Sequence, residues 1–495
     1  MSVASNLLAT KPRAAGKSVF ADDDVYPVHA LDDTKTFRNT LITWTICFND
    51  QLDAERLRSS LSRLLELGDW RKIGGRLRLK DNGALEIYAP HSFTAERPAF
   101  SFSHDNVEAS VGDHVVAKNL PKFNGTAAIW PGPQAFDEFA AKADAPTTLE
   151  DLLAGDAPQI SVHVTSFADA TLIGLSWPHT LMDVMGQHAF LHGWSLVLAN
   201  RETEVPPVLG AREDALCALI EAPSNVKEEY VLKSKQLRGL GMLKFGARFA
   251  WDMLTGPVLE SRTVCLPKDA VAKLRQQAES VLGGGSVEGK APFLSDGDLL
   301  TAWVIHAVAS YSTSARPITA LHALNARFRL SALTTAKGVY LQNMLSPGCT
   351  FVSNEVGKGP IGPIALDNRR ALMKQATEAQ VLAAFREQRL AGDPSTLLYS
   401  DSDAILVPFT DWTKAELLST ADFSPAVLRA GDVSQTRFNP PGTPTFLHAS
   451  TRRPAKTRSL MVVVLGKDHG QNYWLTLKLS PLHWVHIETS IEELK

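Results

Sequence analysis

The sequence predicts an α/β protein of two domains, each built as a mixed sheet with flanking helices. The chain has 495 residues, whereas a single hydrophobic core stops growing at roughly 250–300 residues. Strand-like segments alternate with amphipathic helices in each half, the order expected of α/β domains. A polar, Pro-rich stretch after residue 201 has the composition of a linker. We therefore expect an N-terminal domain over residues 1–205, an inter-domain crossover over 206–258 and a C-terminal domain over 259–495.

The first half opens with a strand–helix–strand pattern. The segment Thr36–Phe48 is rich in β-branched and aromatic residues and predicts a strand. Leucines spaced along residues 52–67 predict an amphipathic helix, with Asp53 as its N-cap. Residues 85–90 predict a short strand that ends at a proline.

A predicted hairpin follows later in this half. Residues 159–167 alternate apolar and polar side chains, and residues 168–170 connect them to an apolar run over 171–177. His163 lies on the first of these strands, where we expect a structural role. Pro178 makes a turn, and a helix is predicted over about 185–199.

The crossover and the second half follow the same principles. Residues 230–254 mix basic and apolar side chains, which favours a helix packed across two domains over one lying on a membrane surface. Arg327 and Arg329 fall in an apolar predicted strand and need partners, because an unpaired buried charge costs several kcal/mol. Ser295 or Asp296 is expected to cap one helix. The other predicted elements are strands at 261–267, 318–330, 403–408, 459–465 and 473–479, and helices at 268–281, 294–311 and about 379–391.

Composition excludes several classes of protein. A net charge of −3 gives no electrostatic reason to expect a nucleic-acid partner. The four cysteines are scattered without a C-x-x-C pair, which argues against a disulfide framework or zinc ribbon and suits a reducing compartment. The sequence has no run of about 18 apolar residues, so we expect no membrane span. Residues 1–20 lack the apolar core of a secretory signal. We expect a cytoplasmic monomer.

The candidate site lies where the hairpin's second strand meets the following helix. His179 and Asp183 are four residues apart at this junction. Histidine is suited to proton transfer because its ordinary pKa is roughly 6.5, and the edge of an element exposes such a side chain to substrate. We interpret His179 as a general base.

The spacing alone is weak evidence, because a chain with 14 histidines supplies about one match by chance. A second match, His29 with Asp33, has no strong strand before it and no immediate helix after it. We interpret this second match as coincidental.

Other catalytic motifs are missing from the sequence. There is no G-x-S-x-G nucleophile elbow and no His-Glu-x-x-His. His188 and His192 are spaced for one helix face but lack the glutamate of a zinc protease, so no metal site is expected. Gly239 and Gly241 are not followed by the third glycine of a dinucleotide loop.

Six stretches in order resemble the BAHD acyltransferases, particularly the fungal branch that includes trichothecene acetyltransferase-like enzymes. The resemblance covers about residues 25–490, and six ordered matches are much more specific than one. The matching stretches are S-W-P-H-T-L-M-D-V-M-G around His179, L-S-R-L-L-E-L-G-D-W-R-K-I-G-G-R-L-R (61–78), L-S-D-G-D-L-L-T-A-W-V in the second domain, L-N-A-R-F-R-L, Y-L-Q-N-M (340–344), and F-T-D-W (409–412) with A-D-F-S-P (421–425).

The resemblance implies a chloramphenicol acetyltransferase-like fold with a channel between two α/β domains. An acyl-CoA thioester enters one side as co-substrate, with no bound cofactor, and a small-molecule alcohol or amine enters the other. His179 would act as general base on the acceptor, without an acyl-enzyme. Thr410 and Trp412 would stabilise the oxyanion through the hydroxyl and the indole N–H.

Four further residues are expected to support the site. Asp183 would point away from the channel and pair with Arg327, which also gives that arginine its partner. Asn343 and Asp422 would be structural or would shape the site.

The chain departs from the family pattern in three places. Val184 replaces the glycine that many members have after the aspartate, Gln342 replaces the usual glycine before Asn343, and D-F-S-P-A replaces Asp-Phe-Gly-Trp-Gly. We expect an acyl-CoA-dependent O-acyltransferase that transfers an acetyl or other short acyl group to a secondary metabolite. The alternative is a protein that keeps the fold but binds, or runs another reaction, in the same channel. A condensation domain is disfavoured because Pro178 stands where those proteins have a second histidine.

Overall fold

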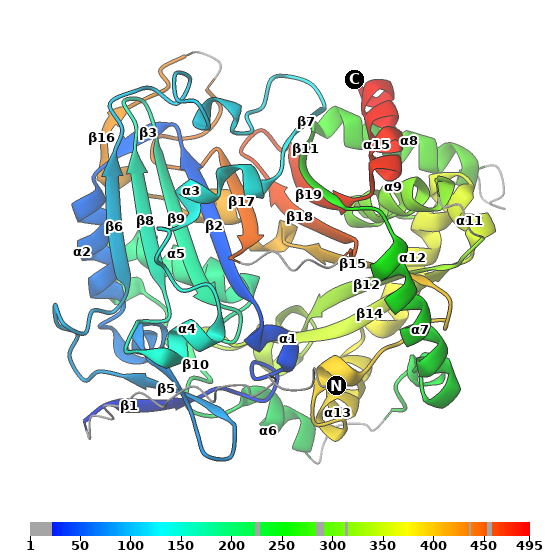
Figure 1. The fold of residues 1–495 in the computed structure, drawn as a ribbon, viewed down its shortest axis with the longest axis horizontal. Helices are drawn as coiled ribbons and strands as arrows, with labels where there is room; N and C mark the ends of the chain where they lie inside the picture. The colour runs from blue at the N-terminus through cyan, green and yellow to red at the C-terminus, as the bar shows by residue number, and fades with distance from the viewer. Residues whose placement is uncertain (1–21, 223–227, 284–291, 312–314, 435–436, 453–457) are drawn as a thin grey trace, which may run out of the picture.

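The computed structural model has two halves, each with its own twisted sheet (Figure 1). It describes residues 22–222, 228–283, 292–311, 315–434, 437–452 and 458–495. The first half contains β1 (Asp24–Pro27), α1 (Lys35–Arg38), β2 (Leu41–Phe48), β3 (Asp50–Leu52), α2 (Ala54–Leu64), β4 (Arg76–Leu79), β5 (Leu85–Ala89), β6 (Ser101–Asn106), β7 (Ala128–Pro131), α3 (Asp137–Ala140), α4 (Leu149–Ala154), β8 (Ser161–Ser166), β9 (Thr171–Pro178) and α5 (Val184–Leu198).

The rest of the chain supplies the second half and two elements that return to the first. In order, these elements are β10 (Val208–Leu209), α6 (Ala215–Glu221), α7 (Gly239–Thr255), β11 (Glu260–Leu266), α8 (Lys268–Leu282), α9 (Asp296–Ser310), β12 (Ile318–Asn325), α10 (Ser331–Thr334), β13 (Val339–Tyr340), β14 (Leu345–Val352), α11 (Asn354–Lys358), α12 (Ile361–Gln375), α13 (Glu378–Leu390), β15 (Ile405–Asp411), α14 (Leu417–Thr420), β16 (Val427–Ala430), β17 (Phe446–Thr451), β18 (Met461–Lys467), β19 (Tyr473–Leu479) and α15 (Pro481–Leu494).

The N-terminal sheet has the order β17-β2-β9-β8-β6. Its central strands β2 and β9 are antiparallel, with Trp44 opposite Leu175. All of β9 is buried, as its nearly continuous apolar run predicts. The predicted hairpin joins β8 to β9. Asp53 caps α2 as predicted, because its carboxylate accepts hydrogen bonds from the N–H groups of Glu55 and Arg56.

The two sheets exchange strands. The C-terminal sheet has the order β14-β12-β15-β18-β19-β11-β7, so β7 from the first half forms its edge. Conversely, β17 from the second half pairs with β2 at the edge of the N-terminal sheet. Each half therefore needs a strand from the other, and the division at residues 205 and 259 remains a prediction.

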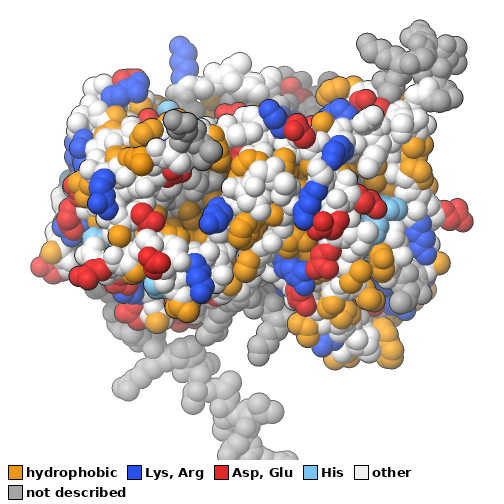
Figure 2. Space-filling model, turned by 90° about the horizontal axis from the view of Figure 1, so that it is seen from above, with side chains coloured by type: hydrophobic (Ala, Val, Ile, Leu, Met, Phe, Trp, Pro, Cys, Tyr) orange, Lys and Arg blue, Asp and Glu red, His pale blue; other side chains and the backbone are white. Residues whose placement is uncertain are grey.

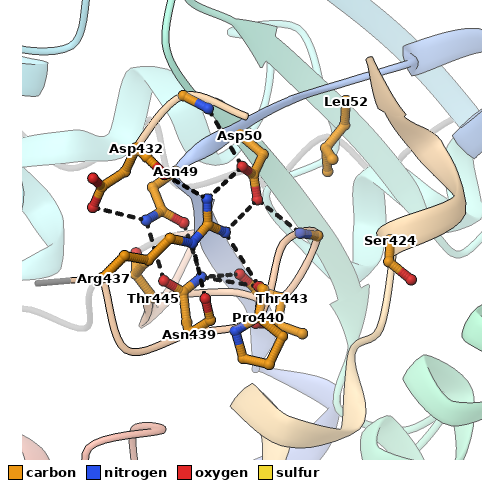
Figure 3. Close-up of polar contacts among 12 residues, drawn as sticks. Asn49, Asp50, Leu52, Ser424, Asp432, Arg437, Asn439, Pro440, Thr443 and Thr445 are labelled. Atoms are coloured by element: carbon orange, nitrogen blue, oxygen red, sulfur yellow. Dashed lines mark hydrogen bonds and ion pairs between the residues drawn. The ribbon is translucent and has the colours of Figure 1, made fainter. Parts of the chain in front are cut away.

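A buried ion pair holds the loop before β17 against the turn between β2 and β3 (Figure 3). Arg437 donates to both carboxylate oxygens of Asp50, each at 2.7 Å. Beside this pair, Asn49 and Asn439 exchange amide hydrogen bonds of 3.1 and 2.8 Å. The clamp fixes the path by which the chain returns to the first half.

Two predicted strands are shorter than expected. β2 begins at Leu41 rather than Thr36, because Lys35–Arg38 forms the helical turn α1, capped by Thr34. β12 ends at Asn325, whose side chain accepts the Arg327 N–H and starts a 3₁₀ turn. Arg327 therefore lies on a turn and not in a strand.

The basic and apolar segment of the crossover forms a helix, α7, only from Gly239 onwards. The prediction that this helix packs across two domains is wrong. Phe245 is its one buried residue, and a row of leucines faces solvent. None of the described helices is long and apolar enough to cross a membrane.

Candidate active site

His179 follows the last residue of β9 and is held by the segment that precedes β2. Its N–H donates to the Thr40 carbonyl at 2.8 Å. Its ring stacks on Phe37, with ring centroids 4.0 Å apart and planes 13° from parallel. Burial lowers the pKa of the imidazole below its usual 6.5, opposed in part by the charge of Asp183. Burial therefore favours the neutral ring, the form that accepts a proton.

Asp183 uses both carboxylate oxygens to join elements from the two halves. One oxygen caps α5, accepting from Met185 N–H at 3.0 Å and Gly186 N–H at 3.1 Å. The other accepts from Arg327 at 2.8 Å and from Met344 N–H at 3.1 Å. The expected Asp183–Arg327 pair is present, and it answers the question of the arginine's partner.

Arg327 also binds the backbone of the loop that carries Asn343. Its guanidinium donates to the carbonyls of Tyr340 at 2.9 Å and Gln342 at 2.6 Å. The loop passes so close to α5 that a Cβ on Gly186 would lie 2.6 Å from the Leu341 carbonyl oxygen. Gly186, two residues beyond the usual family glycine, permits this approach.

Asn343 contacts the backbone of His179 directly. Its amide Nδ2 donates to the His179 carbonyl at 2.9 Å. The same Nδ2 and the Asn343 N–H both donate to Asp32 Oδ1 at 2.7 Å. Asp32 is 1% exposed.

Sequence reasoning missed two residues beside His179. Phe37 fell in a predicted strand, and Asp32 fell within the coincidental match around His29. No local pattern distinguishes either residue, because each contact joins distant segments. Phe37 and His179 are 142 positions apart, and Asp32 and Asn343 are 311 positions apart. Only a prediction of the contact between these segments would have found them.

Thr410 and Trp412 lie at the end of β15 and bond to each other. The Trp412 indole N–H donates to the Thr410 hydroxyl oxygen at 2.9 Å. The Trp412 ring packs 5.5 Å from Trp44, which contacts Trp177 of β9 at 5.0 Å. In this arrangement the indole proton is engaged by Thr410, so the hydroxyl proton of Thr410 is the donor left for a substrate.

Asp422 lies apart from this group. It is exposed, its carboxylate accepts the Ser424 N–H at 3.0 Å, and its own N–H donates to Ser195 in the last turn of α5. Ser195 is twelve residues from Asp183, or about 18 Å along the helix. The geometry brings Asp422 to the far end of α5, while its predicted role, structural or site-shaping, stays a prediction.

His188 and His192 do not form the metal pair that their spacing permits. His188 bonds the Ala415 carbonyl at 2.8 Å, and its ring stacks 6.4 Å from His192. Within the described residues, no three His, Cys, Asp or Glu side chains are grouped to hold a metal ion.

Comparison with known proteins shows the family. No family model matches the chain. O-acetyltransferase PaAT-2 of Phomopsis amygdali is 34% identical over 488 residues, covering 95% of this chain and 98% of the relative. Acetyltransferase pyiB of Pyricularia grisea is 32% identical over 489 residues, covering 98% and 97%. F. sporotrichioides TRI101, solved with coenzyme A and T-2, superposes with a TM-score of 0.65 at 13% identity, covering 94% and 97%.

The structure has the two-domain α/β fold expected from the sequence, and TRI101 shares this fold. The relatives show that the chain belongs to the BAHD-type acyltransferase family, in its fungal branch, and is an acyltransferase.

Proposed function

We propose that this enzyme transfers an acetyl or other short acyl group to a hydroxyl of a secondary metabolite, with His179 as general base. The observation that carries the proposal is the state of His179. Its ring stacks on Phe37, burial lowers the pKa of the imidazole and so favours the neutral form, and the neighbouring carboxylate of Asp183 is engaged by α5 and by Arg327.

The neutral imidazole takes the proton from the acceptor hydroxyl as its oxygen attacks the thioester carbonyl. The tetrahedral intermediate then collapses, the bond from carbon to sulfur breaks, and the proton returns from His179 to the CoA thiolate. The products are the ester and free CoA thiol. No covalent acyl-enzyme is needed.

Thr410 donates its hydroxyl proton to the oxyanion of this intermediate. The indole N–H of Trp412 donates to the same hydroxyl oxygen, and such a chain of hydrogen bonds strengthens each member. Trp412 then acts through Thr410 rather than beside it.

Asp183 and Arg327 fix the His179 turn against the second half, and Asn343 fixes the His179 carbonyl. The names of similar proteins support the proposed donor and acceptor. One relative is named an O-acetyltransferase, and TRI101 was solved with coenzyme A and T-2. Figure 2 shows hydrophobic side chains gathered in a hollow near the middle of one face, with basic and acidic side chains around it. The apolar lining suits an apolar acceptor. We propose that the enzyme works as a monomer in the cytoplasm.

The test is to incubate the purified protein with acetyl-CoA, or longer acyl-CoAs, and a panel of hydroxylated terpenoids and polyketides while CoA thiol release is followed. Acceptor-dependent release with formation of the ester supports the proposal. Tight binding of an acceptor without CoA release would instead support the alternative, a binding protein with this fold. Wild-type turnover in His179→Ala would overturn the assignment of the base.

A further inference from the structure

The short segment between β1 and β2 surrounds His179 on three sides. Thr40 accepts its N–H, Phe37 covers its ring, and Asp32 reaches its carbonyl through Asn343. None of the residues in this segment is expected to take part in the chemistry. Directly or through Asn343, they contact His179, which is.

Asp32 is the buried end of this arrangement. The backbone N–H and the amide Nδ2 of Asn343 both donate to the same carboxylate oxygen of Asp32, Oδ1, at 2.7 Å. The Asn343 amide has a second task, because Nδ2 also donates to the His179 carbonyl at 2.9 Å. Without Asp32 this amide loses the acceptor that sets its rotamer, and a displacement of about 1 Å at a reacting group costs roughly 100-fold in rate.

The surroundings of Asp32 are also buried and polar. Burial raises the pKa of Asp32 to about 7 overall, and the charge of Asp183 adds to this rise. Lys72, buried in the turn after α2, and the hydrogen bonds from Asn343 lower the pKa. A carboxyl group is costly to bury unless its hydrogen bonds are satisfied. This cost makes Asp32 a poor choice for mere packing.

We propose that Asp32 is a positioning residue for acyl transfer: by holding the Asn343 amide, it fixes the His179 carbonyl and thereby the orientation of the imidazole. This inference rests on the proposed role of His179 as the base. Asp32 does not touch the substrates and acts only through Asn343.

A double-mutant cycle tests this dependence. We expect Asp32→Ala and Asn343→Ala each to lower kcat by roughly 10–100-fold while the KM for acyl-CoA changes little. The double variant should be no slower than the slower single variant. Asp32→Asn keeps an acceptor oxygen and should restore kcat to within about threefold of wild type.

Asp33→Ala is the matched control, since Asp33 pairs with Arg38 at 2.5 and 2.7 Å on the other side of the same turn. It should leave kcat of the folded protein unchanged. Multiplicative losses in the double variant, or wild-type kcat in Asp32→Ala, would overturn the proposal. If Asp32→Ala does not fold, an Asp32→Asn variant as slow as Asn343→Ala would overturn it instead. Failure of the base assignment is seen separately, in His179→Ala.

A second inference comes from an independent feature, the solvent-facing side of α7. Leu240, Leu243, Trp251 and Leu254 are 84%, 69%, 59% and 78% exposed. Their spacing of three, eight and three residues places them along one face of the helix. Val258, 72% exposed, continues the row just beyond its end. We refer to these five side chains as the α7 stripe.

Charge favours a lipid surface as the partner of the α7 stripe. Residues 230–259 contain five cationic side chains and one acidic residue, Asp252, in a chain of net charge −3. Glu387 and Asp401 of other elements pair with Lys233 and Lys235 at 3.3 and 2.6 Å, so the positive charge beside the α7 stripe is that of Arg238, Lys244 and Arg248. Lys244 and Arg248 lie within one turn of Leu240 and Trp251. Their ion pairs with Asp403 (3.9 Å) and Asp252 (3.5 Å) are exposed and therefore weak. Apolar residues with Trp on one side and Lys or Arg beside them are typical of helices at membrane interfaces.

Area argues against a second copy of the chain. A stripe one helix wide covers about 25 Å by 10 Å, well below the roughly 800 Å² per partner of a stable protein interface. We infer that the α7 stripe docks on the headgroup region of an anionic bilayer, with the helix lying in the plane of the surface.

Sedimentation with vesicles tests this. Wild-type protein should sediment with phosphatidylcholine vesicles that contain phosphatidylserine, and less with phosphatidylcholine alone or at high salt. The triple variant Leu243→Ser, Trp251→Ser, Leu254→Ser should bind at least about tenfold more weakly with unchanged acyl transfer to a soluble acceptor.

Leu390→Ser is the matched control, because Leu390 is 82% exposed at the end of α13; this variant should bind vesicles like wild type. Wild-type protein that stays in the supernatant with both vesicles would overturn the inference. So would a dimer, detected by light scattering, that the triple variant abolishes, since the partner would then be a second copy.

Discussion

The chain contains two His-x-x-x-Asp segments with identical spacing and different partners. In the first, the His179 ring is stacked on Phe37 and Asp183 is buried against Arg327. In the second, His29 bonds the Gly210 carbonyl at 2.6 Å and Asp33 pairs with Arg38 near the surface. The spacing is thus compatible with quite different tasks. What distinguishes the first segment is the set of partners that the fold brings to it.

The two segments are nevertheless connected in space. Asp32, between His29 and Asp33, contacts Asn343, which contacts the His179 carbonyl. The segment interpreted from the sequence as coincidental therefore supports the turn that carries the candidate base. We still interpret the His29–Asp33 spacing as coincidental, but the segment that carries it supports the His179 turn through Asp32 and Asn343.

The largest expected effect separates the two histidines. His179→Ala should lower kcat by roughly 10³-fold, because it removes general-base catalysis, while leaving the protein folded. His29→Ala should lower the melting temperature but leave kcat of the folded protein within about threefold. Parallel CoA-release assays and thermal melts measure both. Equal losses of kcat would contradict the distinction.

The two aspartates should differ in stability. Asp183→Ala leaves Arg327 without its buried partner and should lower the free energy of unfolding by about 3–5 kcal/mol. Asp33→Ala breaks a partly exposed pair and should cost less than about 1 kcal/mol. Urea unfolding of both variants measures the difference, and similar midpoints would contradict it.

A smaller effect concerns Thr410, the proposed oxyanion donor in the reaction for which His179, and not His29, is the proposed base. Thr410→Val should lower kcat by about 100-fold, the usual loss when one such donor is removed. Trp412→Phe removes only the hydrogen bond that supports Thr410 and should cost less, about tenfold. A larger loss in Trp412→Phe than in Thr410→Val would mean that the indole N–H contacts the substrate directly.

The smallest effect is the response to pH. Burial lowers the pKa of both His179 and His29 below 6.5. Because the neutral form of His179 is active, kcat/KM should be level above pH 6.5 and fall only below it. Folding favours neutral His29, so the stability that it contributes is present above 6.5 and is lost as pH falls through its folded-state pKa. His29→Gln should reduce this acid sensitivity of unfolding without moving the midpoint of kcat/KM; a shifted midpoint would contradict the separation.

Several elements followed directly from local sequence. The apolar run of residues 171–177 lies in a fully buried strand, β9. Asp53 caps α2 as predicted, and of the two candidates Ser295 and Asp296 it is Ser295 that caps α9. These features depend on neighbours within a few residues, which a single sequence displays. The strand predicted to start at Thr36 failed for a local reason too, since the Thr34 cap favoured a helical turn over the β-branched residues that follow.

The supporting contacts required more than local pattern. The resemblance to the family suggested the Asp183–Arg327 pair, 144 positions apart, but gave no hint of the Asp32–Asn343 contact or of the exchange of β7 and β17. Nor did it indicate that Trp412 donates to Thr410. Such features depend on which segments meet after folding, and apolar patterning does not encode that choice residue by residue.

The sequence by itself determined the class of fold, the position of His179 at a strand–helix junction and, through six ordered stretches, the family. Only the tertiary structure decided that Asp183, besides pairing with Arg327, caps α5 and accepts the Met344 N–H, that Asp32 binds Asn343 behind the His179 turn, and that α7 faces solvent. The physical reason is range. Periodicity and caps are set by neighbours three or four residues away, whereas the partners of a buried polar group are chosen by the whole fold, which must satisfy every such group that it removes from water.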